Sequence, residues 1–392
     1  MSIAVPAVPA LLPAATAASA QLVRVEIFDT FAAAAPHWLA LEGDGAVMTP
    51  YQRYAFLEAW QRHVGASEKV VPLIAVGLNG AGAPLTLWPL GRRQFGAVTI
   101  AEYLGGKHAN YNFALWRRDA AASANFADLA AMRAKLAQHV DTLALTNQPE
   151  RWHGVSNPLL NWPHQFSPGF GYCGTLAGSF EEVMQRRTSS DMRRKMRKKA
   201  ERLATHGAIH FSQAHGEHEI SRVLAAFFAQ KGVRLKMQGH ADVFAEPAVQ
   251  RFITAASHTG AIELYSLSVG DEIVATVGGL AGGDRFCTMF SSIAQGRYSG
   301  ESPGEQAMIG TVRAVTERGL SVFDLGVGEA RYKGTFCPDH EPLFDNYIGL
   351  SARGRIVAAL MREQAGIKRI LKQNPLAWAL IEKLRRFRAQ LA

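Results

Sequence analysis

The chain has 392 residues, enough for two domains, and its 48% hydrophobic and 19% charged content is that of a folded protein rather than a disordered one. Its three cysteines form no CxxC pair and its 13 histidines no HExxH motif, so we predict neither a disulfide framework nor a metal site. The net charge of +9 is concentrated in residues 186–202, with nine basic and two acidic residues, and 351–392, with ten and two. Such patches suit phosphate-bearing ligands, an anionic membrane surface or nucleic acid, although a solvated helix face also explains many charge runs.

The N-terminal segment, residues 1–20, is rich in Ala and Pro and contains no Lys or Arg. It lacks the basic region of a secretory signal, and we predict a disordered arm. No uncharged apolar run reaches the roughly 18 residues of a transmembrane helix. These features together predict a cytoplasmic protein.

Residues 21–155 alternate between strand and helix patterns. Two strand patterns flank Asn79-Gly80-Ala81-Gly82, a strong hairpin signal. The spacing of apolar residues predicts strands at 22–28, 70–78 and 85–90 and helices at 31–41, 51–63 and 126–145. Residues 156–178, with three prolines and several glycines, are typical of a connection between two halves.

The second half, residues 179–350, repeats this order of elements and predicts duplication of one α/β unit. A basic helix at 179–205 opens it, and a last strand at 343–350 completes its sheet. The other predicted elements are strands at 208–213, 262–269, 273–280, 285–293 and 322–325 and helices at 217–231, 247–258 and 303–318. Residues 351–392 predict a basic amphipathic helical tail, broken near Pro375, that docks on the protein's own core or lies on an anionic membrane.

The segment Arg297-Tyr298-Ser299-Gly300-Glu301-Ser302-Pro303-Gly304 joins a predicted strand to a predicted helix. Ser302 followed by Glu305 fits a capping box, and Pro303 fits the first helical position. Free N–H groups and the positive end of the helix dipole attract anions, while Gly300 and Gly304 let a ligand approach the backbone. We interpret this segment as a pyrophosphate loop; a well-capped helix after a turn is the alternative.

Three motifs of the second half resemble the GNAT-superfamily acetyltransferases of the CelD/BcsL type, which are linked to cellulose and other polysaccharide biosynthesis. They are the basic run 190–199, Ser302-Pro303-Gly304 opening a helix, and Asp324-Leu325-Gly326 followed by Tyr332-Lys333. The resemblance covers residues 180–350. The first half resembles the degenerate GNAT-like lobe that such proteins share with FemAB-type aminoacyltransferases, without a local motif.

The resemblance implies a mixed α/β fold of tandem GNAT-like lobes, each a twisted mixed sheet flanked by helices, at residues 21–155 and 179–350. It also implies that acetyl-coenzyme A binds the second lobe, without a metal, through Arg297, Gly300, Ser302, Pro303 and Gly304. One position departs from the superfamily's Q/R-x-x-G-x-G/A loop, because Ser302 holds the sixth place. Glu305 adds negative charge there, which weakens diphosphate binding.

Direct acyl transfer needs a general base for the acceptor and an acid for the departing thiolate. The resemblance and the positions of the residues suggest Asp324 or Glu329 as the base and Tyr332 or Tyr298 as the acid. Lys333 is a candidate for holding an acidic group of the acceptor. Turn, packing and surface roles are the alternatives for these residues. Candidates at the acceptor side are Lys231, Arg234 and His240.

The leading functional prediction is an acyl-CoA-dependent N- or O-acyltransferase acting on an envelope sugar or polysaccharide precursor. A FemAB-like aminoacyl-tRNA-dependent transferase is the second, although no segment between 217 and 256 is long enough for an inserted tRNA-binding arm. A non-catalytic accessory protein of a polysaccharide synthase, held at the inner face of the membrane by the basic tail, is the third. DNA binding is not expected, since no helix-turn-helix or zinc-finger pattern accompanies the basic runs.

Overall fold

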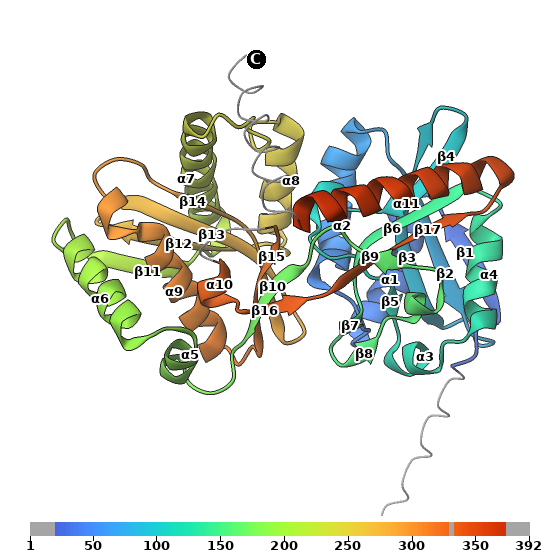
Figure 1. The fold of residues 1–392 in the computed structure, drawn as a ribbon, viewed down its shortest axis with the longest axis horizontal. Helices are drawn as coiled ribbons and strands as arrows, with labels where there is room; N and C mark the ends of the chain where they lie inside the picture. The colour runs from blue at the N-terminus through green and yellow to red at the C-terminus, as the bar shows by residue number, and fades with distance from the viewer. Residues whose placement is uncertain (1–19, 329–332, 374–392) are drawn as a thin grey trace, which may run out of the picture.

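A computed structural model describes residues 20–328 and 333–373 as two lobes that lie side by side, each built on a mixed sheet with helices (Figure 1). The mixed α/β class and the tandem arrangement are as predicted. The predicted N-terminal arm lies outside the described residues, except for residue 20.

The N-terminal lobe contains an eight-stranded sheet of order β1-β2-β3-β4-β6-β17-β9, with β5 paired to β3. Its strands are β1 (Arg24–Phe28), β2 (Val71–Leu78), β3 (Pro84–Phe95), β4 (Val98–Tyr103), β5 (Leu115–Trp116), β6 (Thr142–Pro149), β9 (Gln165–Phe166) and β17 (Leu343–Gly349). The predicted hairpin between β2 and β3 is confirmed, because the side chain of Asn79 accepts hydrogen bonds from the N–H groups of Ala81 and Ala83. A separate ribbon pairs β7 (Arg151–Trp152) with β8 (Val155–Ser156).

The C-terminal lobe contains a seven-stranded sheet of order β11-β12-β13-β14-β15-β10-β16. Its strands are β10 (Gly171–Thr175), β11 (Ile209–Gln213), β12 (Glu263–Val269), β13 (Glu272–Gly282), β14 (Arg285–Ile293), β15 (Val322–Val327) and β16 (Asp339–Glu341). In both sheets the fourth and fifth strands of the order are parallel and joined through a helix: β4 and β6 in one, β14 and β15 in the other. The two lobes therefore repeat one strand order, as the duplication hypothesis predicts.

The helices occupy corresponding positions in the two lobes. Two α-helices connect β1 to β2 in the N-terminal lobe, and two connect β11 to β12 in the C-terminal lobe. The N-terminal lobe has α1 (Phe31–Gly43), η1 (Pro50–Gln52), α2 (Tyr54–Trp60) continued by η2 (Gln61–Gly65), η3 (Gly106–His108), α3 (Arg118–Ser123), α4 (Phe126–Leu136) and η4 (Pro158–Asn161). The C-terminal lobe has α5 (Phe180–Arg187), α6 (Ser190–Ala204), α7 (Gly216–Met237), α8 (Pro247–His258), η5 (Ser299–Glu301), α9 (Pro303–Glu317) and α10 (Lys333–Phe336).

Two predicted helices have different bounds in the structure. The basic helix predicted at 179–205 is broken, because Ser189 accepts a hydrogen bond from the Met192 N–H and caps a new helix, α6. The helix predicted at 126–145 ends at Leu136, and residues 142–145 belong to strand β6.

The lobes exchange strands. The lobe boundaries predicted from the sequence, at 155/156 and 178/179, did not include this exchange. Strand β10 comes from the predicted connection and lies between β15 and β16 of the C-terminal sheet. Strand β17, predicted to complete the C-terminal sheet, lies instead between β6 and β9 of the N-terminal sheet. Its polar residues find their partners there: Asp345 accepts from the Asn147 N–H at 2.9 Å and Asn346 accepts from the Gln148 side chain at 2.8 Å.

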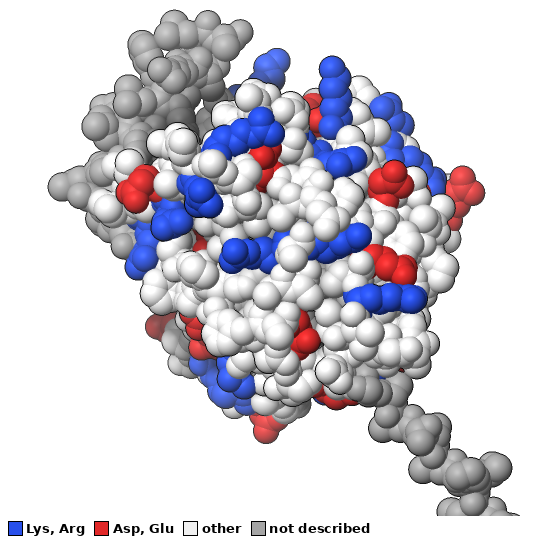
Figure 2. All heavy atoms as spheres, turned by 90° about the vertical axis from the view of Figure 1, so that its right-hand side faces the viewer, with Lys and Arg blue, Asp and Glu red and all other residues white. Residues whose placement is uncertain are grey.

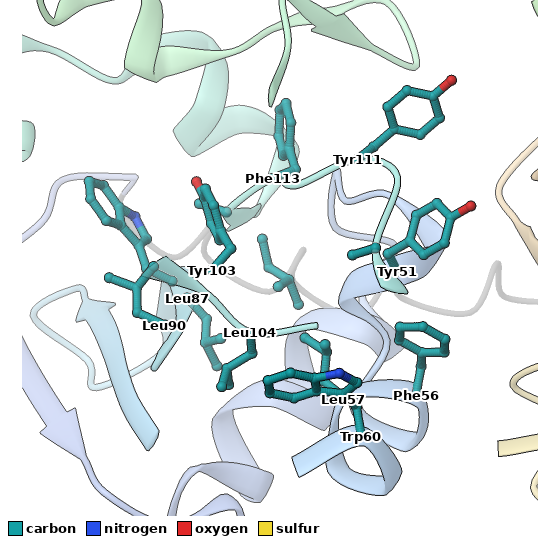
Figure 3. Packing of buried hydrophobic residues seen from close by; sticks show 14 of the residues in the cluster. Tyr51, Phe56, Leu57, Trp60, Leu87, Leu90, Tyr103, Leu104, Tyr111 and Phe113 are labelled. Carbon is teal, nitrogen blue, oxygen red and sulfur yellow. The ribbon is translucent and has the colours of Figure 1, made fainter. Parts of the chain in front are cut away.

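The largest apolar core fills the N-terminal lobe and continues into α7 and α8 of the other lobe. Phe56 of α2 and Phe252 of α8 make an edge-to-face contact with ring centroids 5.2 Å apart. Figure 3 shows the hydroxyl groups of Tyr51 and Tyr111 pointing the same way, away from the apolar side chains of Leu57 and Trp60. The polar ends of these two tyrosines thereby become available to the neighbouring lobe.

The chain then forms helix α11 (Ala352–Gln373), which packs against β17, β6 and β4 of the N-terminal lobe. Ala358 and Ala365 are buried in this contact. The second helix predicted for the tail lies outside the described residues. Among the helices that the structure describes, none has the length and apolar character needed to span a bilayer.

Candidate functional site

Helix α9 begins without the capping box that its sequence predicts. Ser302 has φ 52° and ψ 59°, a left-handed conformation, and its side chain makes no capping hydrogen bond. The 3₁₀ turn η5 ends at Glu301, directly before this residue. The predicted helix start is correct and the predicted capping mode is wrong.

The two side chains of the expected capping box, Ser302 and Glu305, instead accept hydrogen bonds from Lys199 of α6. The Lys199 ammonium group donates to the Ser302 hydroxyl and to the Glu305 carboxylate, each at 2.9 Å. Glu305 therefore enters the site already paired with a cation, which offsets the unfavourable charge that the sequence places at the helix start. Gln306 further ties α9 to α6 by donating to the Met196 carbonyl at 3.0 Å.

The loop leaves room for an anion at this helix start. A Cβ atom built on Gly300 would meet no atom within 4 Å, whereas one built on Gly304 would lie 2.6 Å from Ile293. Gly300 thus borders open space, and Gly304 is needed for the close packing of α9 on β14. Pro303 occupies the first turn, as predicted.

Two cavities flank the basic helix α6. The first, of about 210 Å³, has Met192 and Met196 at its floor and is rimmed by Lys195, Lys199, Arg202 and Glu305. The second, of about 430 Å³, lies between α5, α6 and α9, and combines Phe180, Met184 and Ile309 with Arg193, Arg197 and Arg313. Both cavities are lined by apolar and by basic side chains. Such a lining suits a ligand whose body is flat or aliphatic and that also carries phosphate groups.

Arg297, predicted to bind pyrophosphate, is engaged elsewhere. Its guanidinium pairs with Glu272 at 2.6 Å and lies over the Tyr298 ring at 4.6 Å from the centroid. The Tyr298 hydroxyl donates to the same carboxylate at 2.9 Å. These contacts hold the start of the loop against strand β13.

Strands β14 and β15 pair only at their first three residues, Arg285–Cys287 with Val322–Asp324. Strand β14 continues to Ile293, and its pairing with β13 shifts register between Gly278 and Gly279. This shift makes Met289 the extra residue of a β-bulge. Beyond Cys287 the two parallel strands separate, next to the loop that leads into α9.

Asn110 of the N-terminal lobe lies where β14 and β15 separate. Its amide donates to the Tyr51 hydroxyl at 2.8 Å and to the Thr288 carbonyl at 3.5 Å. A Cβ atom on Gly326 would lie 2.3 Å from this amide, so Gly326, with φ 67°, is required for the contact. A residue of the N-terminal lobe therefore fills the point at which β14 and β15 begin to separate.

Asp324 lies in the interface between the lobes, with no exposed surface. Its carboxylate accepts from the Tyr111 hydroxyl at 2.9 Å, from the Arg285 guanidinium at 3.1 Å and from the Gly326 N–H at 2.6 Å. Burial raises the pKa of Asp324 to about 6, against the lowering effect of Arg285. A carboxylate held by these donors, with no exposed surface, is placed to join the lobes rather than to receive a proton from an acceptor.

Arg285 connects this interface to two further groups. Its second nitrogen pairs with Glu341 at 2.9 Å, and its guanidinium lies 4.1 Å from the Trp152 ring centroid. Burial opposes the charge, but the carboxylates of Asp324 and Glu341 outweigh it and raise the pKa of Arg285. Tyr111, Arg285, Asp324 and Glu341 thus form one buried ionic cluster that joins both lobes.

Lys333 lies at the end of β15 rather than in an open acceptor site. Its ammonium group is buried and donates to the carbonyls of Gly326 and Val327 at 3.2 and 3.1 Å. Burial lowers its pKa to about 8. The other two catalytic candidates, Glu329 and Tyr332, lie outside the described residues.

The acceptor-side candidates lie on α7 and just after it. Lys231 donates to the Ser291 carbonyl of β14 at 3.1 Å, in the half of that strand beyond the bulge. Burial, then the nearby charge of Arg234, lowers its pKa. His240 is exposed past the end of α7. The structure places Lys231 against β14, with Arg234 near it on α7, and leaves His240 at the surface.

Sequence reasoning did not single out Lys199, Tyr111, Asn110 or Arg285. Lys199 stands within the basic run, and nothing in that run indicates its partner. The partner of Tyr111 is 213 residues away in the chain, a separation that no local pattern reveals.

The basic surface of α6 differs from the opposite end of the molecule. Figure 2 views the N-terminal lobe end, where Lys and Arg side chains are interspersed with Asp and Glu on a surface made mostly of other residues. Within the described ranges, no group of three or more His, Cys, Asp or Glu residues is placed to hold a metal ion.

Comparison with known proteins identifies the second lobe. Residues 190–334 match the family model described as an acetyltransferase (GNAT) domain. This segment is a GNAT-type acyltransferase domain. The GNAT domain begins at α6 and includes β14, the loop, α9 and Asp324, and such domains bind acyl-CoA in general. A search of curated proteins found no match.

Solved structures show that the fold extends over both lobes. FemX has a TM-score of 0.54 and 8% identity to this chain, and the similarity covers 82% of this chain and 96% of FemX. A conserved protein of unknown function from Bacteroides thetaiotaomicron has a TM-score of 0.51 and 12% identity, covering 82% of this chain and 99% of that protein. At these identities the likeness concerns the fold alone.

Proposed function

We propose that the protein is an acyl-CoA-dependent N- or O-acyltransferase, with acetyl-CoA as donor and an envelope sugar or polysaccharide precursor as acceptor. The observation that carries the proposal is the uncapped start of α9, which lies beside the basic cavities of α6. The pyrophosphate would accept hydrogen bonds from the loop at Gly300 to Gly304, and basic side chains on α6 would hold the remaining phosphate.

The thioester would then extend from this loop toward the separation of β14 and β15. An amine or hydroxyl of the acceptor attacks the thioester carbonyl, a C–N or C–O bond forms, and the C–S bond breaks. The acceptor's proton passes to a base, and the departing thiolate takes a proton from an acid. Glu329 and Tyr332 remain our proposals for these two roles, and Asp324 becomes a positioning residue that fixes β15 against the other lobe.

For the acceptor, the resemblance of the motifs to the CelD/BcsL type supports a sugar of the cell envelope. Lys231 and Arg234 offer positive charge beside the far half of β14 and suit an acceptor that carries phosphate or carboxylate groups. His240 stays a proposed contact at the rim. Acceptor identity rests on the sequence resemblance more than on the geometry.

A FemAB-like aminoacyl-tRNA-dependent transferase is the second candidate. The basic helix α6 favours it, because its side chains would also contact RNA phosphates. Against it, α7 packs on β13 and β14, and α8 packs on α7 and on α2 and η2 of the N-terminal lobe. The two helices correspond to α1 and α2 of the first lobe, so no projecting arm is present between 216 and 258.

Isothermal titration with acetyl-CoA tests the proposal. Wild-type protein is compared with Gly300→Trp, which fills the open space at the loop, and with Gly43→Trp as matched control. A Cβ atom placed on Gly43 would also meet no atom within 4 Å, and neither glycine has a positive φ, so both variants are expected to fold. We expect binding by wild type and Gly43→Trp and at least a tenfold loss in Gly300→Trp.

The outcomes separate the alternatives. Equal binding by all three proteins would overturn the placement of the donor. No binding by wild type would reject the acyl-CoA donor, and a gel-shift with charged tRNA would then test the second candidate. Binding without thiol release in the presence of any nucleotide-activated sugar favours the accessory-protein hypothesis.

A further inference from the structure

Helix α11 exposes a stripe of large aliphatic side chains, in which Glu363 is the one acidic residue. Ile356, Leu360, Ile367 and Ile370 have exposed fractions of 65%, 65%, 58% and 68%. Their spacing of four, seven and three residues places all four on one side of the helix. Four of the most exposed aliphatic residues of the described chain therefore share one helix face.

This face is opposite to the one that docks. The side of α11 that lies against the sheet carries Ala358 and Ala365, which are buried, and Val357 and Met361, which are partly buried. A helix that only completes a core normally has its large apolar residues inward and its polar residues outward. In α11 Ile356, Leu360, Ile367 and Ile370 are exposed instead, so packing within the lobe does not explain them.

Basic residues flank the aliphatic stripe. Helix α11 contains six basic residues and one acidic residue, Glu363. Arg355, Arg362 and Arg369 recur every seven residues and so form a row along one border of the stripe. Arg369 also lies over the ring of Phe166, 5.0 Å from its centroid, and this ring is itself half exposed. Aliphatic and cationic groups thus form one continuous surface, the α11 face.

We propose that the α11 face binds the surface of an anionic lipid bilayer, with the aliphatic stripe inserted at the level of the headgroups and the arginines on lipid phosphates. An amphipathic helix with aliphatic residues on one side and bordering cations is the arrangement that binds at such an interface. The bilayer contact would keep the acyltransferase lobe near membrane-associated acceptors.

Charge selects this occupant over two others. A second copy of α11 packed on the stripe would bring two rows of arginines together with one acid on each helix. Residues 374–392 carry four basic residues and one acidic residue, so their docking on the stripe would also add like charge. An anionic surface instead attracts each of these cations.

The test uses the full chain and sedimentation with vesicles of phosphatidylcholine that contain 30% phosphatidylglycerol. The stripe variant carries Ile356→Gln, Leu360→Gln, Ile367→Gln and Ile370→Gln. The control variant carries Leu39→Gln and Phe126→Gln, which are also exposed but lie in α1 and α4. Circular dichroism establishes that both variants fold.

We expect the stripe variant to lose at least tenfold in vesicle affinity, the control variant to bind like wild type, and vesicles of phosphatidylcholine alone to bind weakly. A variant with Arg355→Gln and Arg362→Gln should lose affinity while keeping its fold. Equal binding by wild type and the stripe variant would overturn the proposal. So would a wild-type dimer that ignores vesicles and that the stripe variant converts to a monomer in sedimentation velocity.

Discussion

The helix between the parallel strands begins differently in the two lobes. In the N-terminal lobe, α4 starts with a complete capping box: the Asn125 side chain accepts from the Ala127 and Asp128 N–H groups, and Asp128 accepts from the Asn125 N–H. In the C-terminal lobe, α9 starts at Ser302 in the left-handed conformation, without a side-chain cap. The N-terminus of α4 is therefore capped by its own side chains, whereas the corresponding N-terminus of α9 is uncapped and lies beside Lys199.

This difference shows how a duplicated unit separates stability from binding. A capped helix start has its N–H groups satisfied and gains about 1 kcal/mol. An open start forgoes that stabilisation. In α9 it leaves the Gly304 N–H for an anion, because Pro303 has no N–H and the Glu305 N–H donates to the Ser302 carbonyl at 3.0 Å. The basic helix α6 lies beside the uncapped helix start, so we assign the proposed acyl transfer to the C-terminal lobe. The N-terminal lobe contributes Tyr111 and Asn110, which contact β14 and β15 where these strands separate.

The largest expected effect comes from removing the exchanged strand. A chain that ends at Glu341 keeps all seven strands of the C-terminal sheet but lacks β17 and α11. We expect the N-terminal lobe to fail to fold, with early tryptic cleavage before residue 165, while a chain that ends at Gln373 melts like wild type. A cooperative melt of the shorter chain near the wild-type Tm would contradict the role given to β17.

Replacing Arg285 by Met tests the buried cluster between the lobes. It leaves Asp324 and Glu341 without their cation, and loss of one partner of a buried ion pair costs about 3–5 kcal/mol. Arg318→Met is the control, since Arg318 pairs with Glu263 at 2.5 Å but its side chain is 38% exposed, and exposed pairs contribute about 0–1 kcal/mol. Urea unfolding measures the free energy of unfolding of both variants. Equal decreases in that free energy would show that the buried cluster contributes no more than the exposed pair.

Two carboxylates near the starts of corresponding strands should give opposite pH dependence. Burial raises the pKa of Asp324 to about 6, so its contribution to stability is present at pH 4 and is lost as the pH rises to about 6, by roughly 3 kcal/mol. Hydrogen bonds from Ser351, Thr99 and Arg353 lower the pKa of Asp141 to about 2, so its contribution is present above pH 4 and is lost as the pH falls toward 2. Asp324→Asn and Asp141→Asn should each abolish one of these dependences in urea unfolding between pH 2 and 7.

The smallest expected effect is at the open helix start. Ser302→Gly removes the cost of a left-handed serine and should raise the free energy of unfolding by about 0.5–1 kcal/mol. Asn125→Gly, at the closed start, should lower it by a few tenths of a kcal/mol. A loss of stability in Ser302→Gly, measured by thermal unfolding, would show that the Lys199 contact outweighs the backbone strain.

The sequence predicted what depends on local patterns. The hairpin at Asn79, the strand before the loop and the start of α9 at Pro303 follow from turn residues and apolar spacing, and the structure has them at those places. The break at Ser189 was missed because a second N-cap inside a basic run changes no apolar periodicity.

Non-local contacts set the limit of prediction. Nothing near residue 343 indicates that β17 pairs with β6, since register and partner depend on residues about 200 positions away. Asp324 follows the family motif, but its burial is decided by Tyr111, at a separation of 213 residues. The left-handed turn at Ser302 depends on the packing of η5 rather than on the identity of the serine.

The exchange of β10 and β17 also orders events during synthesis. Until residue 349 has left the ribosome, β6 presents an unpaired edge where β17 will lie. The N-terminal half, although made first, cannot mature before the C-terminal half, in contrast to the usual vectorial order of domain folding. A nascent chain of this protein therefore exposes an aggregation-prone edge while residues 150–349 are being made.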